Sequence, residues 1–155
     1  MPSPTKDIRL TEGTIRLAQA CLRVADLSYT RRASLQTSFL EEVEEVVDDL
    51  DLHYEANAEL PGKYGNLVRV DLKVEARTPS LLLAWSSGNA SQAHTVQNEI
   101  FRKWSDLDAR TEQRVTVFDD RFDVYRDEDL KRIRDVSQLV AVSDRQMLES
   151  ILAAA

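Results

Sequence analysis

Three residues in the first half of the chain have the types and the spacing of a metal-dependent phosphodiesterase site. Glu55 precedes, and Asp71 and Lys73 follow, a turn that contains Pro61 and Gly62. If the flanking segments pair as an antiparallel hairpin, we expect Glu55 to face Asp71, with Lys73 beside the pair. Two carboxylates hold a hard cation such as Mg²⁺, and a lysine orients or polarises the attacking water. The alternative is an exposed hairpin face on which charges pair across the strands.

The segments that position these residues have the pattern of two β-strands, over residues 52–60 and 66–76. In the second segment apolar residues alternate with charged ones, which is typical of a strand with one buried face. The apolar set, expected to share one face of the hairpin, is Val68, Val70, Leu72 and Val74. The continuous apolar run over residues 80–87 predicts a third strand, buried on both faces.

Helical and strand periods continue along the rest of the chain. The predicted helices are 13–27, 33–50, 90–107, 127–135 and 144–154, and the further strands are 113–118 and 137–142. The order predicts a single α/β domain over residues 1–155, of the α+β sandwich type. Its mixed sheet is a three-stranded antiparallel meander followed by αβαβα, with helices packing on the sheet. In helix 13–27, Ile15, Leu22 and Cys21 are expected in the core.

The helix predicted over residues 33–50 has an almost purely anionic outer face. Residues 41–62 carry nine acidic residues and no Lys or Arg, although the net charge of the whole chain is only −7. At about 100° per residue, an apolar face forms that is expected to be buried; it consists of Leu35, Phe39, Val43, Val46 and Leu50. The opposite face is the predicted site for a partner, and it consists of Glu41, Glu44, Glu45, Asp48 and Asp49. A basic protein would complement this face.

The order of elements over residues 33–118 resembles that of the PD-(D/E)XK nuclease-like fold. The resemblance implies an Asp on the second strand of the meander and an acid-x-Lys motif on the third. Asp71 matches the first position, but the strand over residues 80–87 contains neither an acid nor a lysine. Alternatively, Asp71-Leu72-Lys73 is itself the acid-x-Lys motif, one strand early, with Glu55 or Glu59 upstream. The resemblance therefore implies the fold more than the activity.

A second resemblance covers the last two thirds of the chain. The run from Gly65 through Val70-Asp71-Leu72 and Leu81-Leu82-Leu83, followed by a helix and by residues 115–121, is similar to prophage-borne bacterial proteins of a domain of unknown function. This similarity implies a phage or prophage setting. The family brings no settled activity. In such a setting, a protein that binds a basic partner would act as an inhibitor, immunity or anti-defence protein.

Composition excludes several classes of function. A pI of 4.9 argues against general binding to nucleic-acid backbones. No apolar run is long enough to span a membrane, and the single cysteine leaves no intrachain disulfide, so we expect a cytoplasmic protein without a membrane partner. The favoured function is a non-catalytic protein that binds a basic macromolecule and needs no cofactor. The alternatives are a Mg²⁺-dependent nuclease and a structural or assembly subunit, and the oligomeric state is left open.

Overall fold

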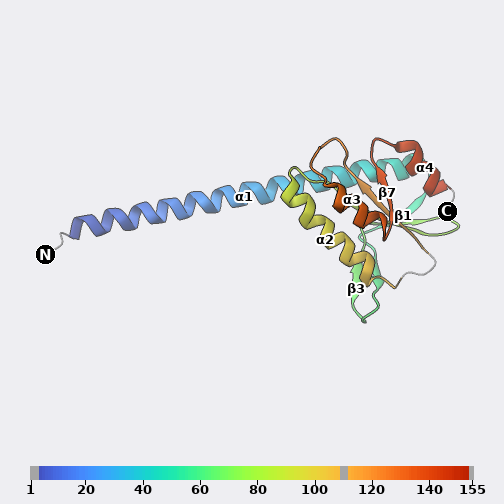
Figure 1. The fold of residues 1–155 in the computed structure, drawn as a ribbon, viewed down its shortest axis with the longest axis horizontal. Helices are drawn as coiled ribbons and strands as arrows, with labels where there is room; N and C mark the ends of the chain where they lie inside the picture. Colours follow the sequence, from blue (N-terminus) through green and yellow to red (C-terminus); the bar gives the residue numbers. More distant parts are fainter. Residues whose placement is uncertain (1–3, 109–111, 154–155) are drawn as a thin grey trace. The chain divides into compact units, whose positions relative to one another are not determined.

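Helix α1 runs without interruption from Pro4 to Asp49 (Figure 1). The two helices predicted over residues 13–27 and 33–50 are therefore one, because no glycine or proline lies between Gly13 and Pro61 to end it. The computed structural model describes residues 4–108 and 112–153; the side chains at 4–12, 28–29 and 31–33 lie outside the description, as does the predicted end of the last helix at residue 154.

The chain divides into two compact units, Met1–Ser34 and Leu35–Ala155. In the first unit every described side chain from residue 13 to residue 27 is exposed. Ile15 is 52% and Leu22 65% exposed, and Cys21 is an exposed free thiol. The prediction that these residues belong to the core is wrong, because an apolar helical period shows that a face avoids water but not what covers it.

The second unit is built on a five-stranded mixed sheet. Its strands and helices are β1 (His53–Ala56), β2 (Glu59–Pro61), β3 (Leu67–Arg69), β4 (Leu72–Glu75), β5 (Ser80–Trp85), α2 (Ala90–Asp106), β6 (Gln113–Phe118), α3 (Asp127–Arg134), β7 (Gln138–Ala141) and α4 (Arg145–Ala153). The sheet order is β1-β4-β5-β6-β7, and β2 and β3 form a separate pair. The meander β1-β4-β5 is antiparallel, whereas β6 and β7 run parallel to β5. This confirms the α/β class and the mixed sheet.

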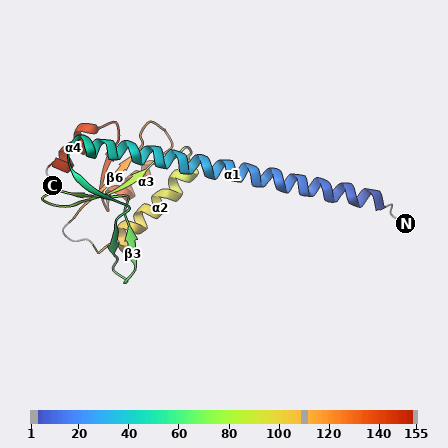
Figure 2. The same ribbon diagram turned by 180° about the vertical axis from the view of Figure 1, so that it is seen from behind.

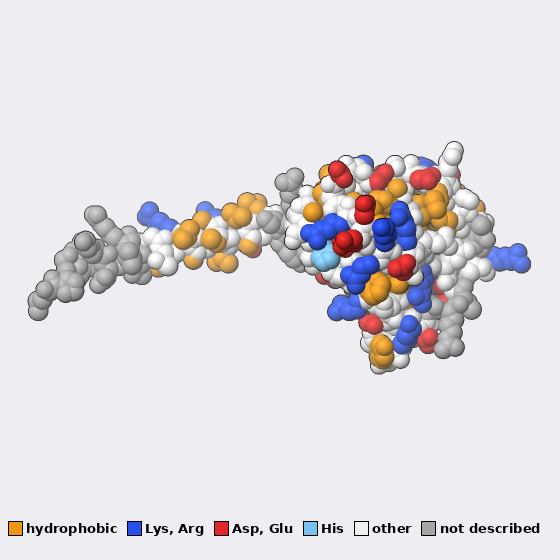
Figure 3. All heavy atoms as spheres, in the orientation of Figure 1, with side chains coloured by type: hydrophobic (Ala, Val, Ile, Leu, Met, Phe, Trp, Pro, Cys, Tyr) orange, Lys and Arg blue, Asp and Glu red, His pale blue; other side chains and the backbone are white. Residues whose placement is uncertain are grey.

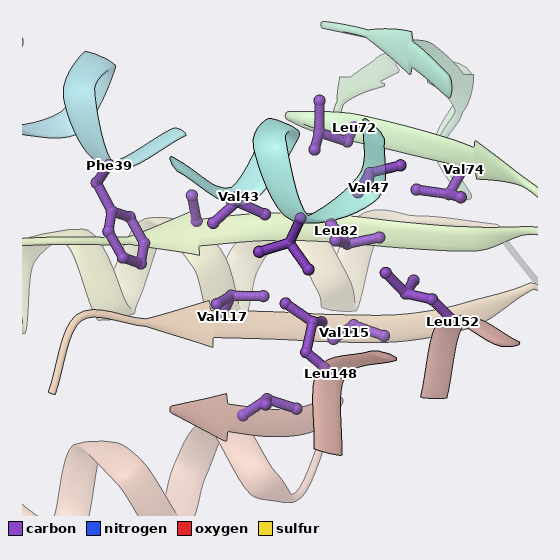
Figure 4. Close-up of a cluster of buried hydrophobic side chains, with 13 residues drawn as sticks. Phe39, Val43, Val47, Leu72, Val74, Leu82, Val115, Val117, Leu148 and Leu152 are labelled. Carbon is purple, nitrogen blue, oxygen red and sulfur yellow. The ribbon is translucent and has the colours of Figure 1, made fainter. Parts of the chain in front are cut away.

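Helices cover both faces of the sheet (Figures 1 and 2). One face packs against α4 and the C-terminal half of α1, where Phe39, Val43 and Val47 meet Leu82 and Val115 (Figure 4). The other face packs against α2 and α3 in a second apolar cluster around Trp85 and Trp104. All six residues of β5 are buried, as predicted for a strand covered on both sides.

The hairpin changes its facing between β3 and β4. Val68 and Val70 pack in the cluster with Trp104, whereas Leu72 and Val74 pack in the cluster with α1. The expectation that these four share one face is therefore wrong. The ladder is interrupted on both arms, by residues 70–71 on one and by Asn57 on the other. Asn57 has a φ of 54°, in the left-handed region that asparagine tolerates better than most residues.

Beyond this bend the hairpin no longer pairs with β5, and two polar side chains bind the backbone of β5 instead. Regular pairing of β4 with β5 ends at Leu82, which faces Leu72. Farther along β5, the Asp71 carboxylate accepts the Ala84 N–H at 2.7 Å. The Gln36 side chain from α1 donates to the Ala84 carbonyl at 2.9 Å and accepts the Ser86 N–H at 3.3 Å. A buried backbone group left without a partner is costly, so these contacts complete the ladder.

We predict that Gln36→Ala lowers the free energy of unfolding by about 1–3 kcal/mol, because it removes a partner from two nearly buried backbone groups. The measurement is urea unfolding followed by the fluorescence of the buried tryptophans. Gln19→Ala, at an exposed position of α1, is the matched control and should have little effect. Equal stability of the two variants would contradict the ladder role of Gln36.

Candidate functional site

The hairpin does not bring the predicted metal ligands opposite each other. Glu55 of β1 faces Lys73 of β4, because the register lies one residue per strand away from the expected one. Glu59 likewise faces Arg69, and their side chains form an ion pair at 2.7 Å. The charges of this face thus stand opposite charges of the other sign, as in the alternative of a paired hairpin surface.

Asp71 lies apart from these exposed charges, half buried beside β5. Burial raises the pKa of its carboxyl above the ordinary value, and the hydrogen bond from Ala84 and the nearby Lys103 partly offset this rise. Its backbone also bonds on both sides, since its N–H donates to Leu82 and its carbonyl accepts from Asn57. Both parts of the residue therefore hold the bend of the hairpin in place.

The acidic residues predicted on the outer face of α1 are mostly without an ion-pair partner among the described residues. The four acids Glu41, Glu44, Glu45 and Asp48 form no ion pair with any residue that the structure describes, whereas Asp49 contacts Arg145 at 2.7 Å. The pKa of Glu44 is raised, first by partial burial and then by repulsion from Asp48 and Glu41. We call these four residues the acidic face; as predicted, Phe39, Val43 and Val46 are buried beneath it.

A second polar cluster joins α1 to the carboxyl ends of β5 and β6. The buried Asp119 carboxylate accepts from the Ser86 hydroxyl at 3.0 Å and from the Arg121 guanidinium at 2.6 Å. Arg121 also contacts Glu42 of α1 at 3.0 Å. Asp119 thus has its partners within the protein, and Asp120 is held by Ser143. Among the described residues no group of three or more His, Cys, Asp and Glu side chains is placed to hold a metal ion.

A shallow depression that no sequence motif signals lies between β3 and the end of α2. Its volume is about 290 Å³, and its lining includes Arg69, Arg102 and Lys103 together with Asp106. The residues come from separate elements, so only the fold brings them together. Figure 3 shows that basic and acidic side chains are interspersed on the surface of the second unit seen in this view.

The fold and these clusters define an α/β protein whose central sheet is covered by helices on both faces. Among the described residues no helix has the length and apolarity needed to cross a membrane. No known family and no curated protein matches the sequence. A solved structure, protein VC1899 from Vibrio cholerae, is similar with a TM-score of 0.46 and 16% identity, over 76% of this chain and 32% of that one. The chain thus spans about a third of the length of VC1899.

The raised pKa of Asp71 predicts a pH-dependent effect of Asp71→Asn. The folded state disfavours the ionised carboxyl and favours the protonated one. The stability that the protonated Asp71 contributes is therefore complete below the ordinary pKa of 3.8 and is lost as the pH rises through the raised pKa of the folded state. Asparagine keeps an acceptor for Ala84 without the charge. Unfolding free energies at about pH 3 and pH 7 should therefore shift in favour of the variant at the higher pH.

The control for this experiment is Asp71→Ala, which also lacks the charge but leaves the Ala84 N–H without its acceptor. At either pH it should be about 1–3 kcal/mol less stable than Asp71→Asn. A difference between Asp71→Asn and the wild type that does not change with pH would refute the assigned effect of burial.

We also predict that the protein does not cleave DNA or RNA in the presence of Mg²⁺ or Mn²⁺. The physical reason is that the two acids of the predicted centre do not face each other and β5 offers no acid-x-Lys motif. The measurement is a nuclease assay on both substrates with each metal. Metal-dependent cleavage that disappears in Asp71→Ala and in Lys73→Ala would establish the nuclease alternative instead.

Proposed function

We propose that this protein is a non-catalytic binding protein that recognises a basic macromolecular partner through the acidic face of α1. The observation that carries the proposal is the state of that face: four neighbouring acids have no cationic partner among the described residues, and mutual repulsion contributes to the raised pKa of Glu44. Like charges one helical turn apart destabilise a helix slightly. A partner that supplies Lys or Arg relieves this repulsion and gains affinity from it.

The rigid support of the acidic face favours binding as well. The residues beneath it are buried against the sheet, and Glu42 and Asp49 flank it with ion pairs to Arg121 and Arg145. A partner therefore meets a surface whose backbone is already ordered, which lowers the entropic cost of association.

The polar residues near β5 support a non-catalytic role. Asp71 contacts the third strand of the meander at Ala84. An acid-x-Lys motif beginning at that position would have an acid at 84 and a lysine at 86, but this chain has Ala84 and Ser86. In the PD-(D/E)XK arrangement this strand carries the acid and the lysine. Asp71 is instead used as a hydrogen-bond acceptor for the backbone.

The proposal includes the setting implied by the sequence resemblance. In a phage or prophage, a cytoplasmic protein that captures a basic partner acts as an inhibitor, an immunity factor or an anti-defence factor. The expected partner is a protein with a positive surface rather than nucleic acid, because the acidic face repels phosphate groups.

The test is a charge reversal on the acidic face, Glu41→Lys with Glu45→Lys and Asp48→Lys. The matched control is Glu75→Lys with Glu99→Lys and Asp123→Lys, which changes the net charge equally at exposed positions of other segments. The probe is an arginine-rich peptide, titrated at low and moderate salt while backbone NMR shifts are recorded. We expect the wild type and the control to show shifts centred on residues 41–48, and the reversal on α1 to lose them together with most of the salt dependence.

Equal weakening by the two triple variants would mean that the peptide senses net charge alone, and the proposed site would be wrong. Thermal unfolding of each variant checks that the fold is kept, since all six positions are exposed.

A further inference from the structure

The exposed part of α1 in the first unit carries a large apolar surface, which the proposed binding of a basic partner by the acidic face does not use. Between residues 13 and 27 the large apolar side chains are 52–71% exposed; they are Ile15, Leu17, Leu22, Val24 and Leu27. Figure 3 shows that apolar side chains gather along this part of the helix. Each carries about 60–120 Å² of apolar surface, so together they expose several hundred Å². Patches of that size mark interaction surfaces.

The distribution of these side chains around the helix shows which side stays in water. At about 100° per residue, Arg16, Gln19, Arg23 and Asp26 fall within one narrow polar strip. The apolar residues occupy the remaining arc of roughly 240°, with Cys21 near its centre. Such an arc is wider than the apolar stripe of an ordinary surface helix. The polar strip can therefore face solvent while the rest of the circumference is covered.

The sequence of this segment is a heptad repeat. Residues 15–21, Ile-Arg-Leu-Ala-Gln-Ala-Cys, are followed by residues 22–28, Leu-Arg-Val-Ala-Asp-Leu-Ser, and preceded by residues 8–14, Ile-Arg-Leu-Thr-Glu-Gly-Thr. The large apolar residues hold the first and third positions of each heptad, on opposite sides of the helix. Because they recur every seven positions, each of these sides keeps facing a neighbouring helix. Alanines at positions 18 and 25 let two helix backbones approach closely.

The partner that we infer for this repeat is another copy of this chain. Because successive heptads present the same residue types, the knobs on one helix fit the holes on an identical helix. The five exposed apolar side chains supply a substantial part of the roughly 800 Å² per partner that a stable interface needs. We propose that copies of this protein associate through the apolar surface of residues 13–27 of α1, in a coiled-coil bundle.

The test compares the wild-type chain with Leu17→Gln/Leu22→Gln/Val24→Gln by sedimentation equilibrium from low to high micromolar concentration. Glutamine has nearly the helix propensity of leucine, so the helix is kept while the seam is lost. The matched control is Arg16→Gln/Arg23→Gln on the polar strip. We expect the wild type and the control to sediment as multiples of the 17.6 kDa chain, and the triple variant as a monomer.

A second measurement reports on the segment itself. Cys21 is the only cysteine, so its reaction with a thiol reagent such as DTNB follows a single site. We expect this reaction to be about tenfold slower in the associated wild type than in the triple variant. Near-ultraviolet circular dichroism of Trp85 and Trp104, both buried in the second unit, verifies that the variants stay folded.

Two results would overturn the proposal. A wild-type chain that is monomeric throughout the concentration range would mean that another molecule, such as a different helix or a lipid surface, covers the segment. Association that persists in the triple variant, with unchanged reactivity of Cys21, would place the contact elsewhere.

Discussion

The central strand β5 imposes the constraint on which the second unit depends. All of its residues are buried, so both of its faces need helices and each of its backbone groups needs a partner. On one side β6 supplies a full parallel ladder, with six paired positions from Ser80 to Trp85. On the other side β4 supplies only part of one, and the side chains of Asp71 and Gln36 complete it. The position of α1 on the sheet follows from this requirement, because Gln36 reaches β5 only from a docked helix.

Some charged residues bind the backbone or side chains around β5, whereas others take no part in holding the fold together. Asp71, a candidate metal ligand in the sequence, accepts a hydrogen bond from Ala84. The buried Asp119 is likewise engaged, by Ser86 and Arg121. The acidic face has no comparable task, since its side chains project away from the core. Retaining such a cluster lowers helix stability slightly. A bound cationic surface would offset that cost, which is why we propose recognition by this face rather than by the hairpin.

Much of the sheet could be predicted from the sequence because local pattern and tertiary environment agree there. The strand over residues 113–118 was predicted with its observed bounds. The helix predicted from residue 90 does begin there, and Asn89 caps it by accepting the Gln92 N–H at 2.9 Å. The predicted register of the hairpin differed from the observed one, because a five-residue turn can be centred on more than one residue and each centre gives a different pairing of the strands. The change of facing after Val70 could not be foreseen, because alternation continues unbroken in the sequence while the backbone bends.

The first unit shows a different limit of sequence-based inference. Ile15, Leu22 and Cys21 have the spacing of a core-facing stripe, and the physical requirement that they avoid water is real. The period does not distinguish a core within the chain from an interface between chains. The recurrence of whole heptads over residues 8–28, rather than of single apolar residues, is the sequence feature on which the proposed association rests.

The two edges of the sheet restrict how the protein can aggregate. β1, one edge strand, is four residues long, carries Glu55 on an exposed position and ends at the left-handed Asn57. β7, the other edge, is also four residues long and is followed by Ser143, which Asp120 holds in place. Short, charged and kinked edges are poor templates for further strands. Both edges are short, and β1 is also charged and followed by a kink, so growth of the sheet by further strands is disfavoured.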